Sequence, residues 1–227
     1  MTSKLVDKPN LTAHYYAKSL LDTDVFITSC SKLKRIVVIF RGTDGVKDWL
    51  TNARIIQVKF GNEETNMKWS EPPGSSAKVH RGFNQAFFSD GIPEKINKVI
   101  DDILANHPDY QILVTGHSLG AALSILCGVY LSLQRPTTEI TVENFGSPRV
   151  GNDHFKNWAN AIPNLVIWRF VQGNDLVTHV PLALMNYSHV GHLFHLCKDS
   201  KVYYLQDGDS SLHYIAAPKC ICDGKFT

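Results

Sequence analysis

The sequence has 227 residues, the length of one large domain or two small ones. Hydrophobic residues make up 44% of it and charged residues 19%, which argues against a disordered tail, a collagen-like fibre or a disulfide-dense miniprotein. The 23 Lys and Arg residues against 21 Asp and Glu residues give a formal charge of +2. Because nucleic-acid-binding proteins usually concentrate more positive charge than this, we do not expect nucleic acid as a partner.

The first part of the chain predicts strands after one helical segment. Leu11–Leu21 has helical character, and Arg35–Phe40 is apolar on both faces, as in a central strand. Residues 61–77 are polar and contain Pro72-Pro73-Gly74, which is typical of a surface loop. The strands predicted here are Val25–Cys30, Arg35–Phe40 and Ala53–Phe60.

Helices and strands then alternate. A helix is predicted from Pro93 to Pro108, because its apolar residues recur at helical spacing. A strand over Gln111–Thr115 leads into Gly116-His117-Ser118-Leu119-Gly120 and an Ala/Leu-rich helix. The later elements are strands over Ile140–Phe145, Leu165–Val171 and Lys201–Leu205, with a helix near Asp153–Ala161. This alternation favours a layered α/β fold, and we predict a single domain over residues 1–227.

The N-terminal residues lack the apolar core of a secretory signal. A cytoplasmic location is therefore favoured, with secretion as the alternative if the sequence begins after processing. The most apolar stretch, Leu119–Leu133, is interrupted by glycines and serines and is too short to span a bilayer. The five cysteines show no zinc-ligand spacing, so we expect no metal. We expect reduced thiols, and disulfide pairing is left open. They are Cys30, Cys127, Cys197, Cys220 and Cys222.

A strand, the pattern G-x-S-x-G and a helix form the sequence context of a nucleophile elbow. In this turn the serine takes a strained backbone conformation, and the flanking glycines remove Cβ atoms that would clash between strand and helix. The serine Oγ then lies near the positive end of the helix, where a developing oxyanion is favoured. Ser118 is therefore a predicted catalytic nucleophile; the alternative is a tight turn with an idle serine.

A serine nucleophile needs a base, the base needs an acid, and in elbow enzymes the chain order is Ser, then Asp or Glu, then His. Asp175 directly follows an apolar strand, where α/β enzymes place working groups; the alternative is a solvated loop aspartate. Among the later histidines, His213 lies in a loop-like stretch that suits a base at a pocket rim. His189 lies next to apolar Val190, which favours a place against the core or a strand partner, and it is the fallback base.

From Ile36 to Tyr214 the sequence resembles the class 3 lipase family, which comprises the fungal-type lipases and their plant and protist relatives. Six signatures carry this resemblance, in order along the chain. They are Val38-Ile39-Phe40-Arg41-Gly42-Thr43 with Asp48-Trp49-Leu50; Val79-His80-Arg81-Gly82-Phe83; Thr115-Gly116-His117-Ser118-Leu119-Gly120-Ala121; Phe145-Gly146-Ser147-Pro148-Arg149-Val150-Gly151-Asn152; Arg169-Phe170-Val171 with Asn174-Asp175 and Pro181; and Tyr187-Ser188-His189-Val190-Gly191.

The resemblance implies an α/β-hydrolase fold with a mostly parallel central sheet flanked by helices. By position it implies Ser118 as the nucleophile, Asp175 as the acid and His213 as the base, and it makes the position of His189 structural. It also implies an oxyanion hole formed by Thr43 and by the backbone N–H of Leu119.

Residues 46–52 occupy the place of the family's lid, a short amphipathic helix that covers the serine in water. Trp49 and Leu50 are therefore predicted lid residues that face the pocket when closed and lipid when open. The alternative is that they pack at the start of the next strand and gate nothing.

These features predict a carboxylic-ester hydrolase that cleaves acyl esters of glycerolipids through an acyl-enzyme, without a metal or organic cofactor. The expected partner is a lipid or a small ester substrate, with transient contact to a lipid interface. The alternatives are a phospholipase A, a short-chain soluble esterase, and a non-catalytic module of the same fold that binds a lipid or a protein.

Overall fold

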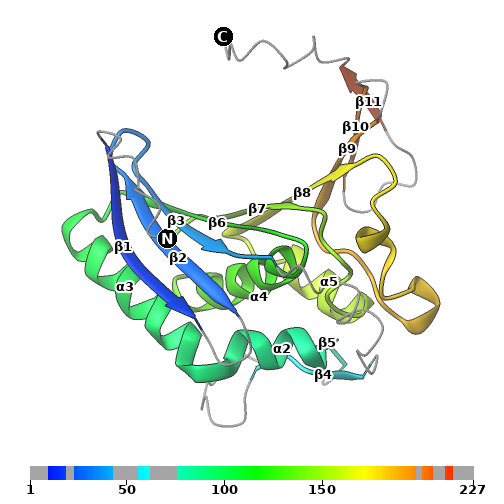
Figure 1. The fold of residues 1–227 in the computed structure, drawn as a ribbon, viewed down its shortest axis with the longest axis horizontal. Helices are drawn as coiled ribbons and strands as arrows, with labels where there is room; N and C mark the ends of the chain where they lie inside the picture. Colours follow the sequence, from blue (N-terminus) through cyan, green and yellow to red (C-terminus); the bar gives the residue numbers. More distant parts are fainter. Residues whose placement is uncertain are drawn as a thin grey trace, which may run out of the picture.

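The computed structural model describes residues 10–18, 23–42, 56–61, 76–197, 201–206 and 213–216. Within these ranges a large sheet has the strand order β1-β2-β3-β6-β7-β8-β9-β10-β11, and the helices lie along one of its faces (Figure 1). Its strands are β1 Leu11–Lys18, β2 Asp24–Cys30, β3 Arg35–Phe40, β6 Gln111–His117, β7 Ile140–Phe145, β8 Leu165–Gln172, β9 His192–Leu196, β10 Val202–Leu205 and β11 His213–Ala216. The α-helices are α2 Arg81–Phe88, α3 Ile92–Asn106, α4 Leu119–Gln134 and α5 Asp153–Asn160.

Short elements complete the described part of the chain. A small second sheet pairs β4, Gln57–Lys59, with β5, Lys78–His80. Three 3₁₀ turns are present: η1 Ser89–Gly91, η2 Leu176–His179 and η3 Ala183–Met185.

The five central strands, β3, β6, β7, β8 and β9, run parallel to one another. The outer strands on both sides of the sheet pair antiparallel. Because parallel neighbours need crossover connections, α-helices join β3 to β6, β6 to β7 and β7 to β8, whereas the turns η2 and η3 join β8 to β9. Parallel strands also end at one common edge, so the residues that follow β6 and β8 come together there. The layered α/β fold predicted from the alternation is confirmed.

The core lies between the central strands and α4. Val38, Val114 and Val142 are fully buried on β3, β6 and β7. Helix α4 is buried along nearly its whole length, which explains why its sequence is apolar all round rather than amphipathic. Within the described ranges, no helix combines the length and the apolar content that crossing a bilayer requires.

Most predicted elements are confirmed with boundaries close to those expected, but the helix predicted over Leu11–Leu21 is wrong. Its described part is strand β1, which pairs antiparallel with β2 from Leu11 opposite Cys30 to Lys18 opposite Asp24. Tyr15 and Tyr16 favour strands, and in so short a segment apolar spacing does not separate helix from strand. Pairing with β2 therefore decides the conformation.

Two further predictions meet the structure only in part. The strand predicted over Ala53–Phe60 is present as β4, although its first three residues lie outside the described ranges, as does most of the predicted loop that contains Pro72-Pro73-Gly74. The loop-like stretch predicted over Asp207–Tyr214 is wrong at its last two residues, because the backbones of His213 and Tyr214 belong to β11 and pair with Tyr204 and Tyr203.

Candidate active site

Ser118 lies in the turn between β6 and α4 and has a positive φ of 56°, with ψ at −118°. Such a conformation is strained for a residue with a side chain and clusters at functional sites. The residue is only 2% exposed, and its Oγ has no hydrogen-bond partner among the described residues. A buried hydroxyl without a partner costs stability, so this geometry is typical of a residue retained for chemistry. The strained backbone conformation predicted for the serine of the elbow is therefore present at Ser118.

The two glycines of the elbow allow three backbones to pack closely. A Cβ at Gly116 would lie 2.3 Å from the carbonyl oxygen of Gly120, and a Cβ at Gly120 would lie 2.4 Å from that of Phe40. Real Cβ atoms do not approach backbone oxygens this closely. The glycines therefore let the start of α4 pack against the ends of both β6 and β3.

Replacing Gly120 with alanine is expected to lower the free energy of unfolding by about 3 kcal/mol, because the new methyl group meets rigid backbone on β3. Urea denaturation measures the change. Gly91→Ala is the control for an added methyl group without a close contact, since a Cβ at Gly91 would meet nothing closer than 3.6 Å. Because the φ of Gly91 is +64°, that variant should still lose about 1–2 kcal/mol. Equal losses in the two variants would show that the packing at Gly120 is not the cause.

Two features of the described residues bear on the predicted oxyanion hole. Leu119 begins α4, and the first N–H groups of a helix have no partner within it. Gly42 packs on the elbow, since a Cβ there would lie 2.8 Å from the carbonyl oxygen of His117. The residue after Gly42 is Thr43, which lies outside the described residues, as do the predicted lid residues Trp49 and Leu50.

Asp175 lies next to the elbow, across the segment that follows β7. Its Oδ1 accepts a hydrogen bond from the N–H of Val177 at 3.0 Å, which fixes the carboxylate at the start of η2. Its Oδ2 is 2.6 Å from the position that a Cβ would take at Gly146, and His117 Nε2 is 3.4 Å from the same position. The N–H of Ser118 donates to the carbonyl of Phe145, the residue before Gly146. The structure thus brings Ser118 and Asp175 to the same short segment.

Gly146 is a site residue to which the sequence analysis assigned no role. Its φ is +59°, a conformation that favours glycine, and any side chain there would displace the carboxylate of Asp175. The signal was available in the sequence, because Phe145-Gly146-Ser147-Pro148 directly follows a central strand at the edge where Ser118 lies. His117, inside the elbow, has its ring between Gly42 and Gly146.

The backbone of His213 is described, and it does not lie beside Ser118 in the sheet. Its backbone starts β11, and β7, β8, β9 and β10 lie between that strand and β6 in the sheet. The placement of its side chain lies outside the described part of the structure. The assignment of His213 as the base therefore remains a prediction.

The other late histidines already make structural contacts. His179 donates from Nδ1 to the backbone carbonyl of Asp175, His195 donates from Nε2 to that of Gly173, and the ring of His192 packs on Trp168. His189, the fallback base, donates from Nε2 to the carbonyl of Thr178. Burial, with help from the nearby guanidiniums of Arg169 and Arg149, holds the pKa of His189 well below its usual range. These contacts give His189 the structural role that the resemblance implied.

The described residues offer no cluster of three or more His, Cys, Asp or Glu side chains that could hold a metal ion. Cys30, Cys127 and Cys197 are free thiols. Cys220 and Cys222 lie outside the described residues.

Comparison with known proteins places this site in a family context. Residues 37–185 match the sequence model of the family described as Lipase (class 3). A lipase from Rhizomucor miehei is 27% identical over 186 residues, which cover 80% of this chain and 47% of that protein. The chain spans about half the length of the curated relatives it matches.

Solved structures agree with the sequence match. The crystal structure of a lipase from Rhizopus microsporus var. chinensis superposes with a TM-score of 0.72 at 30% identity, covering 83% of this chain and 62% of that one. A triacylglycerol lipase whose catalytic centre is described as a serine protease triad superposes with a TM-score of 0.74 at 25% identity, covering 90% and 73%. The predicted α/β-hydrolase fold is therefore confirmed.

Proposed function

This chain belongs to the class 3 lipase family, and from that premise we propose that it is a serine carboxylic-ester hydrolase that cleaves acyl esters of glycerolipids. The observation that carries the proposal is the strained, buried Ser118 at the elbow, with the carboxylate of Asp175 beside the same segment. The names of the relatives agree with this chemistry, since they are lipases.

In the proposed mechanism Ser118 attacks the ester carbonyl, and His213 removes the serine proton and passes it to the departing alcohol. Asp175 orients the imidazole and stabilises its cation. The N–H groups of Thr43 and Leu119 bind the oxyanion, the hydroxyl of Thr43 adds a further hydrogen bond to this charge, and water then hydrolyses the acyl-enzyme. The chain's own residues supply every group in this scheme, so no cofactor is required. For His213 to act as proposed, its imidazole must come within hydrogen-bond reach of Ser118 Oγ in the working enzyme.

A substrate panel tests the proposal. Triacylglycerol, monoacylglycerol, phospholipid and short-chain p-nitrophenyl esters are each assayed below and above the aggregation threshold of the substrate, with Ser118→Ala as the blank. Preference for glycerolipid esters supports the proposal, whereas preference for phospholipid or for dispersed short esters identifies a phospholipase A or a soluble esterase. No hydrolysis of any ester by the folded protein would make it a non-catalytic binding module.

The same panel tests the proposed lid. If Trp49 and Leu50 gate access to the serine, turnover should rise sharply when the substrate aggregates, because an interface stabilises the open form. A rate that changes smoothly through the aggregation threshold would remove the gating role from these two residues.

Replacing Thr43 with valine is expected to lower kcat about 10²–10³-fold, the usual cost of weakening an oxyanion hole, while the thermal unfolding midpoint stays unchanged. Steady-state assays with p-nitrophenyl butyrate measure the effect. Thr141→Val, which makes the same chemical change on β7, is the control and should retain wild-type kcat. A Thr43→Val variant with wild-type kcat would remove the threonine hydroxyl from the mechanism.

A further inference from the structure

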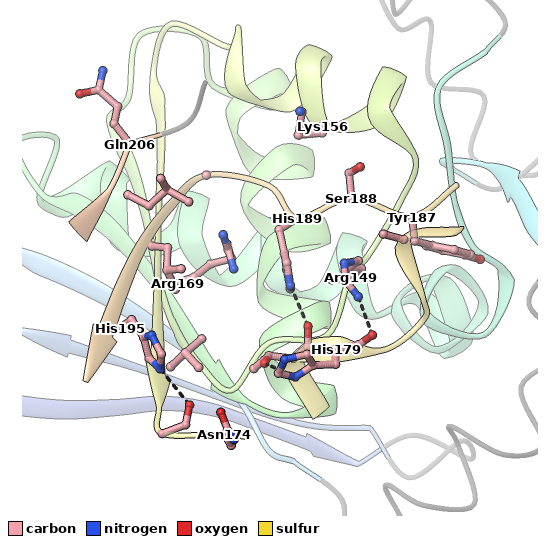
Figure 2. A pocket seen from close by; sticks show the side chains of 17 residues that line it. Arg149, Lys156, Arg169, Asn174, His179, Tyr187, Ser188, His189, His195 and Gln206 are labelled. Atoms are coloured by element: carbon pink, nitrogen blue, oxygen red, sulfur yellow. Dashed lines mark hydrogen bonds between the residues drawn. The ribbon is translucent and has the colours of Figure 1, made fainter. Parts of the chain in front are cut away.

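A concave site lies between β8, β9, α5 and the turn η2 (Figure 2). It is a cavity of about 630 Å³, within the size range of small-molecule sites. The residues on both flanks of Asp175 line it, among them Asn174 and Thr178, but neither Ser118 nor Asp175 does. The proposed hydrolysis therefore gives this cavity no role.

The ionisable side chains of the described residues around this cavity are mainly basic. Among the described residues that line it there are two arginines, one lysine and three histidines, and there is no aspartate or glutamate. Figure 2 shows these side chains arriving from several different elements around one space. We call this site the cationic cavity; the six basic side chains are Arg149, Lys156, Arg169, His179, His189 and His195.

Arg149 is held by carbonyl groups. Its Nη1 donates to the backbone oxygens of His179 and Pro181, and within the described part of the chain it forms no ion pair. Burial lowers the pKa of Arg149 from its ordinary value, yet a guanidinium remains charged in proteins. The carbonyls orient this cation without neutralising it.

His189 shows how strongly positive the surroundings are. The guanidiniums of Arg169 and Arg149 add to burial in lowering the pKa of its imidazole, so the ring stays neutral near pH 7. Since Nε2 donates to the carbonyl of Thr178, Nδ1 is the acceptor nitrogen, and it is buried with no partner among the described residues. Because this nitrogen is shielded from solvent, it does not contact the open space of the cavity.

One carboxylate lies near the mouth of the cavity. Asp153 accepts a hydrogen bond from the hydroxyl of Ser188, and its Oδ1 is 3.7 Å from Nζ of Lys156. The side chain of Asp153 is 62% exposed, so its pairing with Lys156 is screened by water and weak. This pair therefore offsets the charge of Lys156 only weakly.

We propose that the cationic cavity binds a phosphate group, either as free phosphate or as the headgroup phosphate of a small lipid or ester. Guanidinium groups match the oxygens of phosphate in geometry, and a lysine adds a point charge. Several cations around one space favour a multiply charged anion over a single carboxylate.

Calorimetric titration of the Ser118→Ala protein with inorganic phosphate, at constant ionic strength, tests the proposal. The serine variant keeps the measurement separate from hydrolysis, so failure of phosphate binding and failure of the proposed esterase activity are distinct results. Saturable binding is expected. A parallel titration with glycerol 3-phosphate distinguishes the sources: tighter binding than inorganic phosphate indicates a headgroup site, and equal binding indicates a site for free phosphate.

Two added variants locate the binding site. Lys156→Gln removes a partly exposed charge with little risk to folding and should weaken phosphate binding about fivefold. Arg149→Lys keeps the charge but loses the planar guanidinium fork, and it should weaken phosphate binding about tenfold. Lys98→Gln, on the exposed face of α3, is the control and should bind phosphate like the parent protein. Absence of saturable binding to a folded protein, or equal weakening by Lys98→Gln and Lys156→Gln, would overturn the proposal.

Discussion

Ser118→Ala is expected to lower kcat for p-nitrophenyl ester hydrolysis by about 10⁶-fold, the loss seen when a triad serine is removed. The reason is that the acyl-enzyme cannot form without the hydroxyl, and only binding and the oxyanion donors remain to act on the ester. Stopped assays over long incubations measure the residual rate. Because Oγ of Ser118 has no hydrogen-bond partner among the described residues, removing it should leave the unfolding free energy unchanged or slightly raised.

Ser124→Ala is the matched control for this experiment. Ser124 is fully buried on α4, the helix that follows Ser118, and its hydroxyl donates to the carbonyl of Ala121. This variant makes the same chemical change less than two helical turns away, and it should keep wild-type kcat while losing about 1 kcal/mol of stability. If Ser118→Ala retains wild-type turnover, the elbow serine is a structural residue and the proposed chemistry is wrong.

His213→Ala is expected to reduce kcat about as much as the serine variant, because a nucleophile without its base is nearly as poor as no nucleophile. The two residues act as a unit, so the double variant Ser118→Ala/His213→Ala should be no slower than either single variant. Steady-state kinetics on all three proteins, with circular dichroism to confirm folding, measure this non-additivity.

The histidine experiment needs controls that separate catalysis from structure. His154→Ala, at an exposed position on α5, should retain wild-type activity. His189→Asn and His195→Asn alter histidines with structural contacts, and they should change stability more than kcat. If His213→Ala retained activity while one of these two folded variants lost it, the base would have to be reassigned to that histidine.

The sequence by itself determined the elements of the candidate site that depend on local chain geometry. The elbow follows from Gly116, Ser118 and Gly120 between a strand and a helix, because backbone strain and close packing at that turn tolerate few other residues. Most strands and helices could also be predicted, since their apolar periodicity is a local property of the chain. The position of Asp175 after a central strand was likewise visible, because parallel strands end at a common edge.

Only the tertiary structure decided the features that depend on pairing between distant segments. β1 is a strand because β2 lies beside it, and the role of Gly146 depends on the carboxylate of Asp175 approaching it from another loop. The cationic cavity brings Lys156 on α5 and Arg169 on β8 together with His195 on β9, across more than one connection of the sheet. Packing and charge interactions depend on how close two side chains lie in space. The separation of two residues along the sequence does not give that distance until the order of the strands in the sheet is known.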